Sequence, residues 1–277
     1  MNEQKPPAGI EWTRLPRPDG TFTKGYTWNP ISGCQHGCRW VMPDGHTAIC
    51  YAELVATQSP VKSHYPKGFT QVTFHPERLH EPQKVKEPAG IFLDSMSDLM
   101  GAGVRRNDIH QVLDVCRRAH WHTFQLLTKN AGRLGLYPFP PNVWVGASSP
   151  PDIMHGRALT RHQQEAMLEK NLQVLGALDV PVRWMSFEPL SWDCARMVAL
   201  YPGVLQWAVL GAASRGRQEY PPDPVILQRL LDVLDDQGVP TFFKGNLRSL
   251  PRAAQDWRSS FPVPQDEKGA RHDAHLC

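Results

Sequence analysis

Three cysteines near the N-terminus lie close enough in sequence to bind one soft metal centre. Cys34 and Cys38 are separated by Gln-His-Gly, and Cys50 follows a short loop within the segment TWNPISGCQHGCRWVMPDGHTAICYAE, residues 27–53. Thiolates are ligands for zinc and for iron–sulfur clusters. Three thiolates are one fewer than the four that close a structural site. A [4Fe–4S] cluster held by these three would keep one iron open to a further ligand, which is a catalytic arrangement.

Two other interpretations of the cysteine loop stay open. A zinc site could use the same three thiols with His36 or His46 as the fourth ligand. The thiols could also be buried or free and bind no metal. In each case Cys50 can return to the other two if Val41–Ile49 loops out, and Pro43-Asp44-Gly45 is a favourable turn sequence for that.

Polar side chains follow several apolar runs, at points where strands are expected to end. They are Asp94, Ser95, Asp98, Thr128, Lys129, Ser148, Ser149, Ser186, Glu188, Ser214, Arg215 and Lys244. A single polar residue after a strand is usually a cap or a turn, but such residues at six strand ends predict one shared site. Glu188 stands out because an unpaired buried carboxylate is costly. It is expected either to hydrogen-bond a ligand or to pair with Lys129 or Lys244.

The elements that must position these residues alternate between apolar runs and helical patterns. The runs cover residues 25–31, 71–75, 90–95, 123–128, 143–148, 182–189, 206–212 and 240–245. Near-continuous apolar runs are typical of parallel strands buried on both faces. Helices are predicted over 107–119, 159–178 and 224–237, the first with Ile109, Val112, Leu113 and Cys116 on one apolar face. This alternation predicts an α/β fold, a (β/α) barrel of the TIM-barrel type, with a six-stranded open barrel as the near alternative.

Composition limits the class of protein. The 277 residues carry a formal net charge of +3, which permits an anionic partner without requiring one. No apolar run is long enough to span a membrane, and the N-terminus lacks a signal-peptide pattern. A cytoplasmic location is therefore expected, where clustered cysteines more often bind metal than form disulfides. We expect one domain over residues 21–250, an N-terminal arm over 1–20 and a C-terminal tail over 251–277.

The cysteine loop resembles that of radical S-adenosylmethionine (SAM) enzymes. The stretch GCQHGCRW…CYAE is similar to their CxxxCxxC loop with nine residues inserted before the last cysteine. More closely, the chain resembles a phage-associated "three-Cys-motif" family of uncharacterised proteins, placed near the radical SAM enzymes. The matching stretches are TWNPISGC, CYAE, FLDSMSDLM, FQLLTK, VWVGAS, MSFEPL and VLGAAS…GVPTFFK, over roughly residues 25–245.

This resemblance implies cofactors and site residues. Cys34, Cys38 and Cys50 would bind three irons of a [4Fe–4S] cluster and SAM would chelate the fourth. Reductive cleavage of SAM would then give methionine and a 5′-deoxyadenosyl radical that abstracts hydrogen from a substrate. Trp40 would pack near the adenine. Further cofactor-binding candidates are Asp94, Ser95, Asp98, Lys129, Ser148, Glu188, Ser214 and Lys244. Gly211-Ala212-Ala213-Ser214 stands where relatives have Gly-Gly-Glu-Ser, so that acid is missing here.

The implied partners are an electron donor, an unidentified substrate for which a nucleic acid or nucleotide is one candidate, and a partner protein. No membrane partner is expected. A nucleic-acid-binding protein of a mobile element is a separate alternative. It would use the basic clusters at Arg105–Arg106, Arg117–Arg118 and Arg215–Arg217.

Overall fold

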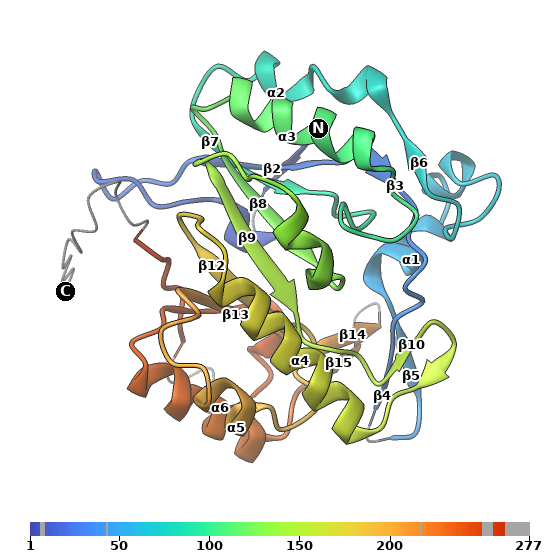
Figure 1. Cartoon of the computed structure of the whole chain (residues 1–277). Helices are drawn as coiled ribbons and strands as arrows, with labels where there is room; N and C mark the ends of the chain where they lie inside the picture. The colour runs from blue at the N-terminus through green and yellow to red at the C-terminus, as the bar shows by residue number, and fades with distance from the viewer. Residues whose placement is uncertain (6–8, 43, 216–217, 251–256, 264–277) are drawn as a thin grey trace.

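The fold is mixed α/β and is dominated by one curled β-sheet (Figure 1). The computed structural model describes residues 1–5, 9–42, 44–215, 218–250 and 257–263. The strand order of the sheet is β1-β2-β7-β8-β9-β12-β13-β16. The bounds are β1 Asn2–Gln4, β2 Lys24–Trp28, β7 Ala89–Leu93, β8 Thr123–Thr128, β9 Val143–Ser148, β12 Arg183–Phe187, β13 Trp207–Leu210 and β16 Thr241–Phe243. The strands from β2 to β16 pair in parallel, and β1 adds to β2 antiparallel. The predicted parallel α/β fold is confirmed.

Closure into a full barrel is not observed. The sheet ends at β1 and β16, and the described residues show no pairing between these edges, so the curled sheet is a half-barrel (Figure 1). The predicted strand over residues 71–75 is also corrected. Only Thr73–Phe74 is extended, as β6, and it pairs with β3 (Ile31–Ser32) in a separate small sheet. The run is too short to cross the main sheet, and Pro76 begins a 3₁₀ turn directly after it.

Helices cover the convex face of the sheet. The three predicted helices form as α3 Arg106–Arg118, α4 Arg161–Gly176 and α6 Pro224–Asp236. A capping box of Thr160 and Gln163 starts α4, and the Asp223 side chain caps α6. The apolar face of α3 packs as predicted, because Ile109, Val112 and Cys116 are fully buried.

Shorter elements fill the connections. They are α1 Tyr51–Ala56, α2 Glu81–Lys84, α5 Ala195–Ala199, β4 Arg39–Val41, β5 Thr47–Ile49, β10 Ile153–Met154, β11 Arg157–Ala158, β14 Ala213–Arg215 and β15 Gln218–Tyr220. The 3₁₀ helices are η1 Glu11–Thr13, η2 Val61–His64, η3 Pro76–Arg78, η4 Ala131–Leu136 and η5 Gly245–Leu247. No helix in the described ranges is both long and apolar enough to cross a membrane.

The concave face of the sheet changes character along the strands. Alternate residues of a strand share a face, so Trp184 and Ser186 project from the same face of β12, and Glu188 directly follows its end. Below the strand ends lies the aromatic floor, a buried cluster of Phe92, Trp144, Trp184, Trp207 and Phe242 from the sheet and Trp12 from the N-terminal segment. Gly146 leaves room for it, since a Cβ there would lie 2.4 Å from the Trp184 ring. The ends of the strands carry polar groups instead.

The first residues of the chain complete this floor, which corrects the predicted N-terminal arm. Trp12 is only 2% exposed, and its ring contacts those of Phe92, Trp184 and Trp207 at centroid distances of 4.8–5.9 Å. The Gln125 amide donates to the Trp12 carbonyl. The segment enters because β7 has glycine at position 90, where a Cβ would lie 1.9 Å from the Thr13 carbonyl oxygen. A half-barrel leaves this apolar surface open, and the N-terminal segment covers it.

Part of the predicted tail also packs on the sheet. The Phe261 ring stacks on Trp207 with centroids 5.6 Å apart, and Ser259 bridges to Phe242. Residues 251–256 and 264–277 of the predicted tail lie outside the described residues.

Candidate functional site: a cavity at the strand ends

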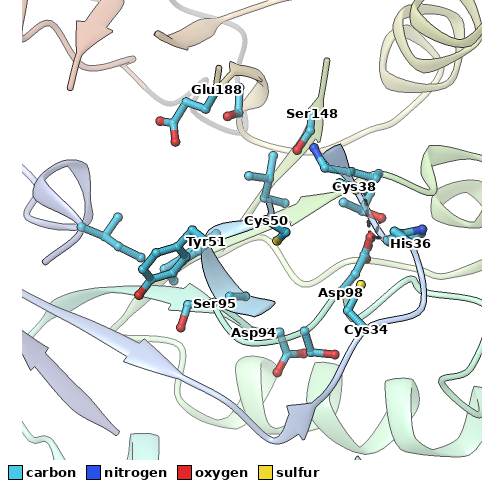
Figure 2. A pocket seen from close by; sticks show the side chains of 18 of the residues that line it. Cys34, His36, Cys38, Cys50, Tyr51, Asp94, Ser95, Asp98, Ser148 and Glu188 are labelled. Carbon is cyan, nitrogen blue, oxygen red and sulfur yellow. Dashed lines mark hydrogen bonds and ion pairs between the residues drawn. The ribbon is translucent and has the colours of Figure 1, made fainter. Parts of the chain in front are cut away.

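A cavity of about 390 Å³ opens above the aromatic floor, at the carboxyl ends of the strands (Figure 2). It is lined by Cys34, Cys38, Trp40, Cys50, Asp94, Ser95, Asp98, Lys129, Ser148, Glu188 and Lys244. These are all the residues selected from the sequence for the cluster and for SAM, except Ser214. Ser214 is exposed on β14 and does not line the cavity. The volume and the mixed apolar and polar lining are typical of small-molecule sites.

The residues inserted between the second and third cysteines form a β-hairpin. Its strands β4 and β5 pair Arg39 with Ile49 and Val41 with Thr47. Cys38 and Cys50 are the next pair at the open end of this ladder, where the Cys50 N–H donates to the Cys38 carbonyl at 3.3 Å. Opposed residues of an antiparallel pair have Cα atoms about 5 Å apart. The insertion therefore returns the third cysteine to the second one.

The three thiols share the cavity but lack charge compensation there. Burial raises the pKa of both Cys34 and Cys38 to about 12, although the His36 backbone N–H donates to Cys34 and Lys129 lies near Cys38. Within the described residues, no three His, Cys, Asp or Glu side chains converge closely enough to hold a metal ion. The donor types nevertheless fit an iron–sulfur cluster, because three thiols from one loop face one cavity. A cationic centre would supply the compensation that buried thiolates require.

His36, between Cys34 and Cys38, is held by Asp98. Its Nε2 lies 2.7 Å from the Asp98 Oδ2, and both side chains are about 7% exposed. Asp98 also accepts hydrogen bonds from the Thr128 hydroxyl and from the Lys129 and Met100 backbone N–H groups. Burial alone would raise the pKa of Asp98, but His36 and these donors together lower it. Asp98 is therefore a carboxylate that braces the cysteine loop.

Asp94 is a second buried carboxyl group in the cavity wall. It has a left-handed backbone conformation, with φ of 56°. Its Oδ1 accepts a hydrogen bond from the Ile31 N–H, while its buried Oδ2 has no partner among the described residues. Burial raises the pKa of Asp94 well above its ordinary value, and the nearby Asp98 charge acts in the same direction. Burial therefore favours the neutral form of Asp94, and its Oδ2 is a polar atom that can hydrogen-bond a ligand.

Glu188 and Lys244 form an ion pair across the mouth of the cavity. The Lys244 Nζ lies 3.0 Å from the Glu188 Oε2, so one of the two partners expected from the sequence is observed. Burial would lower the pKa of Lys244, but the charge of Glu188 outweighs it and raises that pKa. The other carboxylate oxygen, Oε1, is buried without a partner in the described part of the chain. Glu188 can thus keep its ion pair and still accept a hydrogen bond from a ligand.

A family model covers most of the chain and names no activity. It matches residues 9–255 and is described as "Protein of unknown function (DUF5131)". The chain belongs to this family. The matched range begins just before Trp12, so it includes the segment that completes the aromatic floor.

Several solved structures of spore photoproduct lyase are similar to this chain at low identity. A mutant of that enzyme gives a TM-score of 0.47 at 8% identity, covering 87% of this chain and 80% of that chain. The enzyme complexed with dinucleoside spore photoproduct gives 0.45 at 8% identity, covering 77% and 74%. A mutant with bound AdoMet and dinucleoside spore photoproduct gives 0.42 at 10% identity, covering 79% and 62%. No curated protein matches the chain.

The remaining selected residues have local roles in the cavity wall of this family member. Trp40 is 5% exposed, and the Lys129 ammonium lies 5.5 Å from its ring centroid. The Ser95 hydroxyl donates to the Asn29 side chain. Ser148 ends β9 and is buried at the wall.

Some lining residues were not singled out as cofactor sites. Trp12 and Phe92 form the floor of the cavity, and Phe69 and Tyr51 lie beside the cysteine loop. Tyr51 directly follows Cys50, so its position next to the last cysteine was a usable signal. The sequence carried no comparable signal for Trp12, because no periodic pattern links Trp12 to the sheet.

Proposed function

We propose that this protein is an enzyme that binds a [4Fe–4S] cluster through Cys34, Cys38 and Cys50 and acts with SAM on an unidentified substrate. One observation carries the proposal. A single cavity at the strand ends is lined by all three thiols of one loop and by the polar residues that end several strands. A bound cluster would supply one electron for reductive cleavage of SAM. An electron donor is therefore required, and free thiols fit a reducing compartment such as the cytoplasm.

The protein's own residues would bind and orient SAM. Asp94 and Glu188 directly follow β7 and β12 and line the cavity. Each has one oxygen without a partner among the described residues, and that oxygen can hydrogen-bond an amino or hydroxyl group. Trp40 offers an aromatic surface for a purine ring, with the Lys129 charge at its face. The Glu188–Lys244 ion pair would hold the Glu188 oxygen in place for such a contact.

The floor of the cavity would protect reactive chemistry from water. Trp12, Phe92 and Leu127 present apolar surface below the polar residues, and the fully buried rings of Trp184 and Trp207 lie beneath. Exclusion of water limits side reactions of reactive species. The N-terminal segment is therefore part of the proposed active site.

Anaerobic reconstitution tests this proposal. The expected protein is brown, contains about four irons per chain, has the broad visible absorbance of iron–sulfur clusters, and forms 5′-deoxyadenosine when SAM and dithionite are added. Protein that stays colourless and takes up only zinc under these conditions would contradict the proposal.

The His36–Asp98 pair favours zinc as a second candidate. Metal-bound histidines usually donate their other ring N–H to a carboxylate, and the buried Nδ1 of His36 has no partner among the described residues. His46 fits less well as the fourth ligand, because its side chain is 62% exposed and lies beside Asp44 in the hairpin turn. Metal analysis after aerobic and anaerobic purification separates the candidates, and His36→Ala should abolish binding only of zinc.

A further inference from the structure

A second, larger cavity of about 750 Å³ lies on the other side of the cysteine loop. Cys34, His36, Asp98 and Lys129 line both cavities, so these residues form a shared wall. The far side of the second cavity is built by the β10–β11 hairpin, by α4, and by the loops that follow β7 and β8. A molecule in the second cavity therefore lies against four residues that also line the first.

The second cavity carries a surplus of positive charge. Lys129, Arg157 and Lys170 line it, together with His36 and His155. Asp98 is the one carboxylate among the described lining residues, and its charge is already matched by His36 and three further hydrogen-bond donors. The cavity therefore attracts anions.

These three cations are free of carboxylate partners in the described part of the chain, where no ion pair within 4.0 Å involves any of them. Neighbouring cations behave differently. Arg39 pairs with Glu53, and Lys244 pairs with Glu188. Within the described residues, the ammonium of Lys129 in the shared wall and the cations of Arg157 and Lys170 in the second cavity therefore remain available to an anion.

The three cations reach the second cavity from separate elements. Lys170 lies on α4 and rests against Gly132 in the loop after β8, where an added Cβ would be 3.4 Å from the Lys170 Nζ. Arg157 approaches from β11 and Lys129 from the end of β8. Cations from three separate elements suit a ligand with more than one anionic group, and the planar guanidinium of arginine matches phosphate oxygens.

The two cavities differ in aromatic content. The cysteine cavity offers Trp40 and Tyr51, whereas the described lining of the second cavity has no aromatic ring besides two histidines. Proteins that bind bases stack them on aromatic side chains. The second cavity is therefore suited to the phosphates of a ligand and not to its bases.

We propose that the second cavity binds the phosphate groups of a nucleotide or nucleic-acid substrate whose reacting part crosses the shared wall into the cysteine cavity. The identity of the reaction rests on the proposed function, while phosphate binding itself does not. Lys129 lies in the wall and would contact both parts, and Lys170 and Arg157 would contact phosphates only.

Binding of a fluorescein-labelled single strand of about eight nucleotides, followed by fluorescence anisotropy, tests this proposal. The variant is Lys170→Glu with Arg157→Glu, and the matched control is Lys62→Glu with Lys67→Glu, two exposed lysines outside the second cavity. The cavity variant should bind about 10-fold or more weakly, and the control should stay within about 2-fold of the parent. The slope of log affinity against log salt should fall by about 1.4, near 0.7 per lost phosphate contact.

Competition identifies the group recognised. Inorganic pyrophosphate should displace the labelled strand, and adenosine should not. Affinity that rises with strand length identifies a strand as the source of the phosphates, and equal affinity for a nucleoside diphosphate identifies a free nucleotide. Equal weakening by the control variant, or displacement by adenosine as strong as that by pyrophosphate, would overturn the proposal.

The binding assay needs neither SAM nor a reductant, so its failure is distinguishable from failure of the proposed function. Protein that holds iron but binds no phosphate refutes only the second cavity as a phosphate site. Protein that binds phosphate but takes up no iron refutes only the proposed function.

Discussion

The two halves of the concave face of the sheet use the same strands for different purposes. Below the strand ends, the face is filled by the aromatic floor and sealed by Trp12 from the N-terminal segment. Two to four residues further along the strands, the same face carries Asp94, Ser148, Ser186 and Glu188 around an open cavity. The lower half buries apolar surface and stabilises the fold. The upper half keeps polar atoms of Asp94 and Glu188 that have no partner in the described part of the chain, which costs stability and is typical of ligand sites.

The division predicts that changes in the upper half alter chemistry and that changes in the lower half alter stability. Cys38→Ser should give the largest effect. Mutation of residues that only hydrogen-bond metal ligands already lowers metal affinity or activity about 10- to 100-fold. Loss of a ligand itself should therefore reduce 5′-deoxyadenosine formation by more than about 100-fold. Iron content should fall with it, while the melting temperature of the metal-free protein should change little. Cys116→Ala, in the core away from the cavity, is the control for iron content. Full activity in Cys38→Ser would show that the Cys38 thiol is not a ligand of the cluster.

A methyl group on β7 should break the lower half. Gly90→Ala would place its Cβ 1.9 Å from the Thr13 carbonyl oxygen and push the N-terminal segment off the floor. Overpacking of this kind usually costs about 1–3 kcal/mol of unfolding free energy, and the upper end is expected here. Urea unfolding measures it. Gly135→Ala is the matched control, because a Cβ there meets nothing within 4 Å. Equal stability of the two variants would mean that the segment does not seal the floor.

A change at Asp98 should affect both chemistry and stability, since Asp98 supports the cysteine loop from a buried position. Asp98→Asn loses the carboxylate that accepts from His36 and should cost about 2 kcal/mol at pH 7. The pKa of Asp98 is lowered in the folded protein, so its contribution is complete above its ordinary pKa and is lost as the pH falls. The stability difference between the parent protein and Asp98→Asn should therefore shrink below about pH 4. If the difference in unfolding free energy between the two proteins is constant from pH 7 to pH 3, the stabilisation does not come from the charged form of Asp98.

The smallest effect on stability is expected at the cavity mouth. Glu188→Gln weakens an ion pair whose side chains are 20% and 29% exposed, so solvent screening limits the loss to about 1 kcal/mol or less. SAM binding, measured by calorimetry on the reconstituted protein, should weaken several-fold because the acceptor oxygen loses its charge. Asp193→Asn, which breaks an ion pair with Arg229 outside the cavity, should leave SAM binding unchanged. If both variants bind SAM equally well, Glu188 is not a ligand contact.

Much of the upper half could be predicted from the sequence, because its signals are local. Apolar runs identify buried parallel strands, and the carboxyl ends of such strands meet at one edge. Asp94, Lys129, Glu188 and Lys244 could therefore be selected without coordinates. Ser214 followed the same rule but lies on the small β14–β15 hairpin, which leads it away from the cavity.

The lower half depended on contacts between distant segments. Nothing local links Trp12 to Trp184, and the short polar stretches around it resemble a free arm. The His36–Asp98 pair likewise joins residues 62 positions apart. The closed barrel was predicted because strand counts cannot distinguish a sheet that closes from one whose open face is filled by another segment.

The hairpin between Cys38 and Cys50 has a consequence for recognising related chains. Both cysteines belong to the base of a two-stranded ladder, so residues can be added to or removed from its far end in opposed pairs while the base stays the same. The distance between these cysteines along the chain is then free to vary in steps of two. A sequence pattern with one fixed spacing would therefore miss homologues in which these two cysteines still lie at the base of the hairpin.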